Sequence, residues 1–185
     1  MASTADFRNG LVLRYEGALF QIVYFQHVKP GKGGAFVRTK LKNILSGAVI
    51  DRTFRAGERV EDVRLERRPL QYLYSSDGIY YFMDGGTFEQ YPVSAATVEA
   101  QTKFLKETTV VDALFHEGRI LLIELPNFIE LEVSQTDPGL RGDTATGGTK
   151  PATLETGAVV QVPLFINTGD RIRVDTRTEQ YLERV

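Results

Sequence analysis

The residue best placed to do chemistry is Lys32, which lies in the glycine-rich segment Val28–Phe36. Pro30 fixes its own φ, and glycine adopts positive φ without steric cost. A backbone with so little side-chain bulk can enter a narrow crevice, where an ammonium group at its apex can donate hydrogen bonds to an anion. An ordinary hairpin with a solvated lysine explains the same residues, because short motifs often match by chance. The loop comprises Lys29, Pro30, Gly31, Lys32, Gly33 and Gly34.

The residues that most enzymes use are missing or badly spaced. The chain has two histidines, His27 and His116, which are far apart in sequence, and it has no cysteine. A zinc site or a cysteine nucleophile can therefore be set aside, and a Ser-His-Asp triad has no local support. The loop is not a P-loop either, because Gln26 replaces its first glycine and Gly33 replaces its magnesium-binding Ser or Thr. We expect no enzymatic activity, no metal and no cofactor.

The formal net charge of −2 conceals an uneven distribution. Residues 1–62 carry ten Lys or Arg and six Asp or Glu, whereas residues 63–126 and 127–185 each carry six and nine. Five cations and no carboxylate lie between Glu16 and Asp51. A positive local field favours a polyanionic partner. A basic face that is simply solvated accounts for the charge equally well.

The residues on either side of the loop have a composition and a period that are typical of β-strands. Leu19–Phe25, before the loop, is rich in β-branched and aromatic residues. After the loop, an apolar set alternates with three cations. This pattern predicts a long hairpin with one apolar face and one basic face. The apolar set is Val37, Thr39 and Leu41, and the cations are Arg38, Lys40 and Lys42.

The chain as a whole consists of short apolar and aromatic runs broken by Gly, Asn, Asp and Pro, which is the pattern of all-β barrels. We predict three small barrels, an SH3-like one at residues 1–62 and two more at 63–126 and 127–185. Turns are expected at Glu16-Gly17, Ser46-Gly47 and Asp77-Gly78. The best helix candidate is Ser94–Leu105, with Ser94 as its cap.

Several finer features of the second and third barrels are also predicted. Thr87–Tyr91 is expected to form one turn of helix. The tyrosines between Leu70 and Met83 could stack on bases, although half-buried packing is the commoner role of strand tyrosines. Thr136–Thr153 is expected to be irregular, with backbone N–H groups and hydroxyls that suit contact with RNA. A similar residue pattern occurs in Met83–Tyr91 and in Val174–Tyr181, which suggests that the second and third barrels share one fold.

Four separate motifs in this order resemble the bacterial translation elongation factor P family. The first is the loop Lys29-Pro30-Gly31-Lys32-Gly33. The second combines Gly142-Asp143-Thr144 with Gly147-Gly148. The third runs from Lys150-Pro151-Ala152 through Gly157, Val160, Val162-Pro163, Ile166 and Gly169, and the fourth is Val174-Asp175-Thr176-Arg177 with Tyr181 and Arg184. The resemblance extends over essentially the whole chain.

The resemblance implies a KOW-type SH3-like barrel followed by two OB-fold barrels, in an L shape that mimics tRNA. It implies binding to the ribosome between the peptidyl and exit sites, beside the peptidyl-tRNA. There the factor promotes peptide-bond formation and relieves stalling at consecutive prolines. Lys32 would approach the acceptor end of the tRNA, and Arg38, Lys40 and Lys42 would contact RNA. Gly142, Asp143, Thr144, Gly147 and Gly148 would approach the mRNA codon in the exit site, and Tyr181 and Arg184 the small subunit and the tRNA anticodon arm.

Some points stay open at this stage. Relatives carry Lys or Arg at the loop tip, and Lys32 is compatible with β-lysylation by a modifying enzyme, with another modification or with none. A paralogous branch of the family and a general single-stranded-RNA-binding OB-fold protein are alternatives, as is an adaptor without RNA contact. The N-terminus does not resemble a signal peptide, and Ile120–Ile123 is too short to cross a bilayer. We therefore expect a cytoplasmic monomer without membrane contact.

Overall fold

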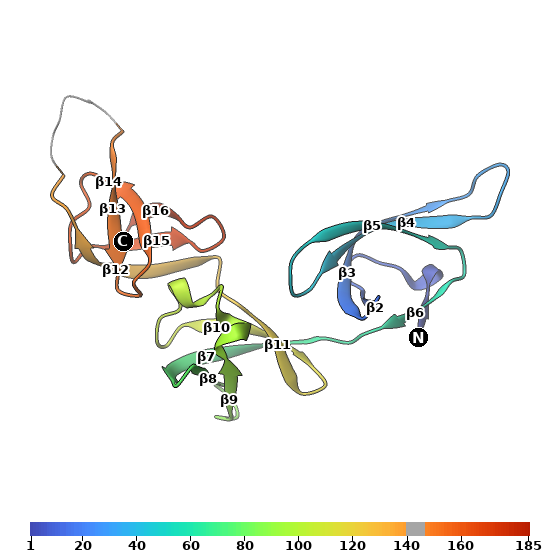
Figure 1. Cartoon of the computed structure of the whole chain (residues 1–185), viewed down its shortest axis with the longest axis horizontal. Helices are drawn as coiled ribbons and strands as arrows, with labels where there is room; N and C mark the ends of the chain where they lie inside the picture. Colours follow the sequence, from blue (N-terminus) through green and yellow to red (C-terminus); the bar gives the residue numbers. More distant parts are fainter. Residues whose placement is uncertain (140–146) are drawn as a thin grey trace. The chain divides into compact units, whose positions relative to one another are not determined.

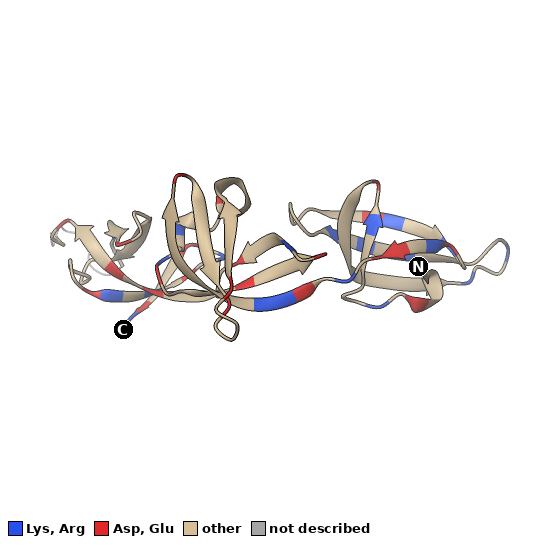
Figure 2. Ribbon diagram, turned by 90° about the horizontal axis from the view of Figure 1, so that it is seen from below, with Lys and Arg blue, Asp and Glu red and all other residues tan. Residues whose placement is uncertain are grey.

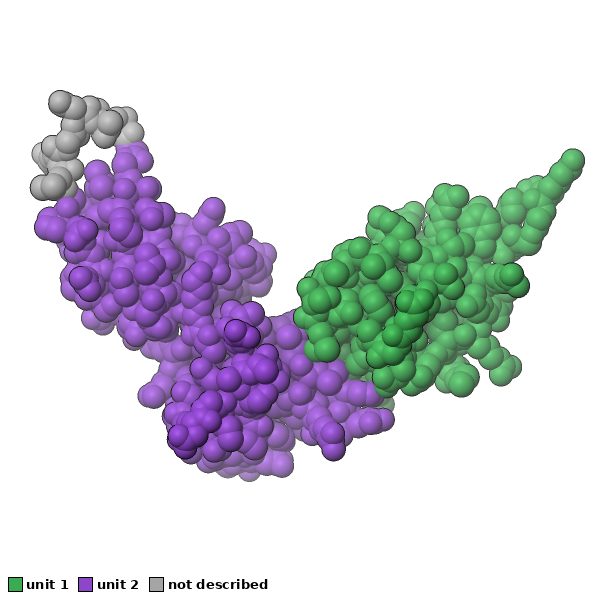
Figure 3. Space-filling model, in the orientation of Figure 1, with its two compact units in different colours: residues 1–66 green, residues 67–185 purple. Residues whose placement is uncertain are grey.

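The computed structural model describes residues 1–139 and 147–185, and it divides the chain into two compact units, residues 1–66 and 67–185 (Figure 3). The described residues form three sheets in which the paired strands are antiparallel (Figure 1). The all-β prediction is therefore confirmed. No helix among the described residues is long and apolar enough to cross a membrane.

The first unit contains a six-stranded sheet in the order β1-β6-β2-β3-β4-β5. Phe7, Leu13, Ile22, Leu41 and Phe54 contribute to its buried core. The strands are β1 (Ala2–Ser3), β2 (Val12–Tyr15), β3 (Ala18–Val28), β4 (Phe36–Asn43), β5 (Val49–Arg55) and β6 (Arg59–Asp62), with a 3₁₀ turn, η1 (Thr4–Asp6), after β1.

The second unit contains two five-stranded sheets. The first of them has the order β11-β10-β7-β8-β9 and the second the order β14-β13-β12-β15-β16. The strands of the first are β7 (Glu66–Ser76), β8 (Ile79–Met83), β9 (Gln90–Ser94), β10 (Val110–His116) and β11 (Arg119–Glu124). Those of the second are β12 (Phe128–Thr136), β13 (Thr149–Leu154), β14 (Val159–Pro163), β15 (Arg171–Asp175) and β16 (Gln180–Arg184).

Both sheets of the second unit have one strand order when their strands are counted along the chain. The first strand is central, with the second and third on one side and the fourth and fifth on the other. The two similar segments do not occupy equivalent places, however, because Asp84 follows the second strand of its sheet, whereas Asp175 is the last residue of the fourth strand of the other sheet. The similarity between the two segments reflects a turn geometry that both share. Phe88 and Glu179 both have positive φ and donate their N–H groups to the carbonyls of Asp84 and Asp175.

The predicted tight turns are present and have a common cause. Glu16-Gly17 and Asp77-Gly78 join adjacent strands, and both residues of each pair have positive φ. This is the type I′ geometry, whose twist matches that of a hairpin and which favours glycine at the second position. Glu117-Gly118 forms a third such turn, between β10 and β11. The Ser46-Gly47 turn between β4 and β5 is also confirmed.

The predicted helix at Ser94–Leu105 is largely wrong. The structure has a four-residue helix, α1 (Ala95–Val98), and a 3₁₀ turn, η2 (Thr102–Phe104), and the Ser94 side chain makes no capping hydrogen bond. The segment breaks because its large apolar side chains enter different cores. Val98 and Leu105 belong to the core of the sheet β7–β11, and Phe104 belongs to the core of the sheet β12–β16.

Two further local predictions are corrected. Thr87–Tyr91 is not helical, because the Asp84 carboxylate accepts the N–H groups of Gly86 and Thr87 in a turn and β9 begins at Gln90. The irregular segment is shorter than Thr136–Thr153, because Thr149–Leu154 forms β13 and pairs with both β12 and β14. Both errors arose where polar, turn-forming residues border a strand.

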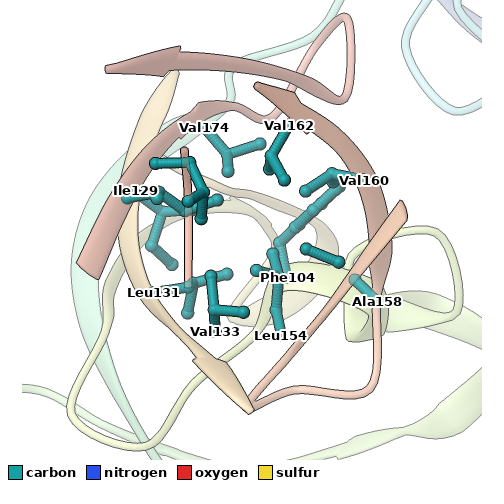
Figure 4. Close-up of a cluster of buried hydrophobic side chains, with 12 residues drawn as sticks. Phe104, Ile129, Leu131, Val133, Leu154, Ala158, Val160, Val162 and Val174 are labelled. Carbon is teal, nitrogen blue, oxygen red and sulfur yellow. The ribbon is translucent and has the colours of Figure 1, made fainter. Parts of the chain in front are cut away.

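Phe104 joins the two sheets of the second unit. Its ring is 2% exposed and lies among residues of the third sheet such as Leu131, Val133 and Leu154 (Figure 4). Around it, Lys103 pairs with Glu179, and the Lys106 ammonium lies 3.0 Å from the Glu155 carboxylate. The Thr156 hydroxyl donates to the Lys103 carbonyl at 2.8 Å. A residue from the second domain thus completes the third domain's core.

The domain boundaries at residues 62 and 126 remain our proposal, and so does the L-shaped arrangement.

Candidate functional site

Lys32 lies in the loop that joins β3 and β4, the two longest strands of the first sheet. The last pair of the hairpin is Val28 with Phe36, so that the loop spans residues 29–35. Within the first unit this hairpin extends beyond the rest of the sheet (Figure 1). Lys32 is exposed and has no hydrogen-bond or ion-pair partner in the part of the chain that the structure describes. Its ammonium group is therefore free to bind an external partner.

The glycines of the loop differ in the reason for their presence. Gly33 has a φ of +111°, a conformation that side chains other than glycine rarely adopt. Gly31 and Gly34 lack positive φ, and a Cβ added to either would meet no atom within 4 Å. The fold therefore does not require glycine at those two positions. Their lack of bulk matters only if a partner closely approaches the loop.

The stem of the hairpin has the two faces that its alternation predicted. Val37, Thr39 and Leu41 are buried, and the Thr39 hydroxyl donates to the Arg52 carbonyl at 2.8 Å. The intervening cations Arg38, Lys40 and Lys42 are exposed. Figure 2 shows the distribution of both charges on the ribbon. The Lys40 ammonium lies 3.1 Å from the Asp51 carboxylate, and the Arg38 guanidinium lies 5.5 Å from the Phe36 ring centre. The three cations and Lys32 thus belong to one hairpin.

The candidate loop of the third domain is described only in part. Gly142, Asp143 and Thr144 lie outside the described residues. Gly147 has a φ of +107°, and a Cβ on Gly148 would lie 3.0 Å from the Leu164 side chain. Gly139 is tighter still, because its Cβ would lie 2.5 Å from the Leu164 carbonyl oxygen. Backbone conformation and packing therefore account for these three glycines without any partner.

Lys150, at the other end of this loop, has a structural role. It is 6% exposed, and its ammonium donates to the Asp137 carbonyl at 2.6 Å. A buried ammonium needs such a partner, because desolvating an unpaired charge is costly. The bond connects the start of β13 to the residue that follows β12.

Tyr181 and Arg184 lie on β16 in the second unit. Tyr181 is half-buried and packs against the core of the sheet β12–β16, which we call the third core. Arg184 is exposed, lies 5.8 Å from the Phe165 ring centre and is 3.8 Å from the Asp170 carboxylate. Neither residue belongs to the hairpin that carries Lys32. The predicted site residues that the structure describes therefore belong partly to the first unit and partly to the second.

Asp175, in the last hairpin of the chain, is held in its charged form. The Arg177 side chain donates to it at 2.7 and 3.1 Å and the Arg177 backbone N–H at 2.9 Å, and together these bonds lower the pKa of Asp175 from 3.8 to about 2. Because the folded pKa is depressed, this stabilisation is present above pH 4 and is lost as the pH falls towards 2. We expect the free energy of unfolding to fall less steeply between pH 5 and 2 in Asp175→Asn than in the wild type. Parallel slopes in denaturant titrations across that range would contradict the assignment.

The sequence reasoning did not identify Tyr24 or Arg55. The β3–β4 register shifts between Ile22 and Tyr24, which leaves Val23 as an extra residue. Without this bulge, the period of two that buries Phe20 and Ile22 would bury Tyr24 as well. Instead Tyr24 pairs with Lys40 and is 47% exposed. Arg55 pairs with Phe36 at the same end of the hairpin as the loop. Only strand pairing places both on the basic face.

The fold and the site define an all-β protein of small domains with an exposed lysine at the tip of a basic hairpin. No group of metal-ligating residues occurs within the described ranges. The fold is shared with eukaryotic translation initiation factor 5A from Methanococcus jannaschii, with a TM-score of 0.50 and 21% identity, over 66% of this chain and 94% of that one. It is also shared with a translation initiation factor eIF-5A family protein from Naegleria fowleri (TM-score 0.52, 14% identity, 67% and 96% of the two chains). At these identities the likeness concerns the fold.

Sequence comparison identifies the family. Residues 3–60 match the elongation factor P KOW-like domain, residues 65–123 the elongation factor P OB domain and residues 129–184 the elongation factor P C-terminal domain. Elongation factor P of Nocardia farcinica is 60% identical over all of this chain and 99% of its own length. That of Thermoanaerobacter sp. (strain X514) is 57% identical over all of both chains. The chain belongs to the elongation factor P family, which makes it a non-enzymatic translation factor that associates with the ribosome.

Proposed function

We propose that this protein binds the ribosome between the peptidyl and exit sites, beside the peptidyl-tRNA, and promotes peptide-bond formation at consecutive prolines. The observation that supports this most directly is Lys32, which is exposed and has no partner among the described residues, on a loop whose Gly31 and Gly34 are not required by the fold. Such a loop suits a confined site, and membership of the family supports the proposal that this site is on the ribosome. The modification state of Lys32 is a separate question, and β-lysylation by a modifying enzyme is one answer to test by mass spectrometry.

The mechanism that we propose is positional. Proline reacts poorly when the ends of the two tRNAs are badly oriented, and orientation alone contributes ~7–11 kcal/mol in favourable intramolecular reactions. A small part of that effect is enough to relieve a stall. In this proposal Lys32 donates hydrogen bonds to the acceptor end of the peptidyl-tRNA and transfers no proton. The loop glycines allow close approach, while Arg38, Lys40 and Lys42 contact phosphates of tRNA or ribosomal RNA.

We propose that the third domain contacts the mRNA, the small subunit and the anticodon arm of the tRNA. Gly142, Asp143, Thr144, Gly147 and Gly148 would face the exit-site codon of the mRNA. Tyr181 and Arg184 would approach the small subunit and the anticodon arm of the tRNA. We further propose that the protein acts in the cytoplasm as a monomer.

The test is translation of a triple-proline reporter by ribosomes that lack this factor. Adding the purified protein should restore full-length product and leave a proline-free reporter unchanged. A general single-stranded-RNA-binding protein would instead bind short free RNA appreciably and give no proline-specific effect. An adaptor without RNA contact would sediment with ribosomes independently of salt, whereas phosphate contacts make binding strongly salt-dependent. Equal yields from the triple-proline reporter with and without the protein would refute the proposal.

The predicted L shape has its own test in small-angle scattering. A compact globule of this length should have a radius of gyration of ~16 Å, and three domains in an L roughly 21 Å. We expect the larger value, because a tRNA-like outline leaves the domains at its two ends apart. A measured value near the smaller one would rule out the tRNA-like shape.

A further inference from the structure

The basic side of the Lys32 hairpin continues across three strands. We call it the stem face and define it by the outward residues of β3, β4 and β5. Their neighbours Val37, Leu41 and Phe54 point into the core, so the alternate residues point away from it. The outward residues are Gln21, Tyr24, Gln26 and Val28 on β3, Phe36, Arg38, Lys40 and Lys42 on β4, and Val49, Asp51, Thr53 and Arg55 on β5.

Tyr24 is the unusual member of the stem face. Its side chain is 47% exposed, and it makes no hydrogen bond, ring contact or cation–π contact with the residues that the structure describes. Tyr15, by contrast, packs against Phe20 and Phe54, and Tyr72 packs against Phe82. The bulge at Val23 turns Tyr24 outward and places it in register with Lys40. An aromatic ring thus lies in the middle of a basic surface, and it has no partner within the described part of the chain.

The charges of the stem face are mostly positive. It carries Arg38, Lys40, Lys42 and Arg55 against one carboxylate, Asp51. The side chains of Lys40 and Asp51 are 52% and 80% exposed, and an ion pair that open to water is weak. Arg38, Lys42 and Arg55 form no ion pair within residues 1–139 and 147–185. The face therefore attracts anions.

We propose that the stem face binds a strand of RNA, with a base stacked on Tyr24 and phosphates bound by the surrounding cations. Exposed aromatic rings within a positive groove are the usual means of binding unpaired nucleotides. A protein partner fits less well, because lysine is depleted at protein interfaces and the stem face carries Lys40 and Lys42. The inference rests on the proposed function, because it takes the RNA to be a nucleotide strand at the ribosomal site. It adds Tyr24 and Arg55 to the residues that hold the factor there.

The test compares substitutions of Tyr24 in the full chain. Binding to purified ribosomes that carry peptidyl-tRNA is measured by sedimentation for the wild type, Tyr24→Ala and Tyr24→Phe. Tyr24→Ala should weaken binding about 5- to 150-fold, the range for loss of one stacked base, and Tyr24→Phe should stay within about twofold. Equal loss in both variants would overturn stacking, because the ring would then be irrelevant, and so would an unchanged affinity of Tyr24→Ala.

Tyr74→Ala is the matched control. Tyr74 is 46% exposed, but its ring stacks on Tyr81 in the second domain at 4.8 Å, so its removal should leave ribosome affinity unchanged. Thermal unfolding checks that each variant folds. If Tyr24→Ala unfolds, Tyr24→Thr replaces it, because threonine keeps the strand propensity without a ring.

Two more measurements separate this proposal from the proposed function. A photoreactive benzoylphenylalanine at position 24 should crosslink to RNA, and crosslinks to ribosomal protein alone would overturn the proposal. If the wild type fails to bind ribosomes, the proposed function fails. In that case, the affinity of the protein for a short labelled oligouridine at low salt tests independently whether the stem face binds RNA. Tyr24→Ala should bind that RNA more weakly than the wild type, and equal affinities would overturn the proposal.

Discussion

Replacing Lys32 with alanine should abolish relief of stalling on a triple-proline reporter while leaving the free energy of unfolding unchanged. The fold is unaffected because Lys32 is exposed and has no partner among the described residues. The activity is lost because alanine cannot donate a hydrogen bond at the tip of the loop. A charged donor that is fully used in a dry site contributes roughly 1.5–3 kcal/mol, which is a factor of about 10 to 150 in rate.

Lys29→Ala is the matched control for this experiment. Lys29 is exposed in the same loop and carries the same charge, but it lies at the start of the loop, next to the last pair of the stem. Its loss should weaken ribosome binding modestly and preserve most of the relief. If Lys32→Ala rescues the reporter as fully as the wild type does, the positional mechanism is wrong. If both variants lose activity equally, the net charge of the loop matters and the position of Lys32 does not.

Phe104→Ala should destabilise the third domain by ~3–5 kcal/mol, the usual cost of removing a buried phenylalanine. The ring is 2% exposed and fills the third core from outside its own sheet. The Lys103–Glu179 and Lys106–Glu155 pairs around it are partly exposed, and such pairs contribute ~0–1 kcal/mol each. The ring, and not the ion pairs, should therefore hold the two sheets together.

Hydrogen exchange distinguishes this effect from general unfolding. In Phe104→Ala, amides of β12–β16 should lose protection, whereas those of the first unit, residues 1–66, should not change. Phe88→Ala serves as the control, because Phe88 is 70% exposed and its removal should cost little. An unchanged denaturation midpoint for Phe104→Ala would show that Phe104 does not stabilise the third core. Loss of protection in the first unit would mean that the whole chain unfolds cooperatively.

Local sequence rules succeeded where a feature depends on neighbours in the chain. The alternation of Val37, Thr39 and Leu41 with cations, and the Glu16-Gly17 and Asp77-Gly78 turns, follow from strand period and from φ preferences. The helix predicted at Ser94–Leu105 does not form over its whole length, because its apolar residues are buried in two cores that belong to two different sheets. The candidate site shows the same difference. Local sequence predicts Lys32 at the tip of the loop, whereas the exposure of Tyr24 depends on strand pairing.

The sequence by itself determined the family, the all-β class and the lysine at the tip of a basic hairpin, because motif spacing and a period of two are local properties of the chain. Tertiary structure alone decided that Phe104 enters the core of the sheet β12–β16, that the Leu164 backbone requires glycine at position 139, and that the bulge at Val23 exposes Tyr24. Each of these depends on strand register or on packing between distant segments. Many side chains from distant segments compete for the same buried space, and the outcome sets such contacts. A short stretch of sequence therefore cannot predict them.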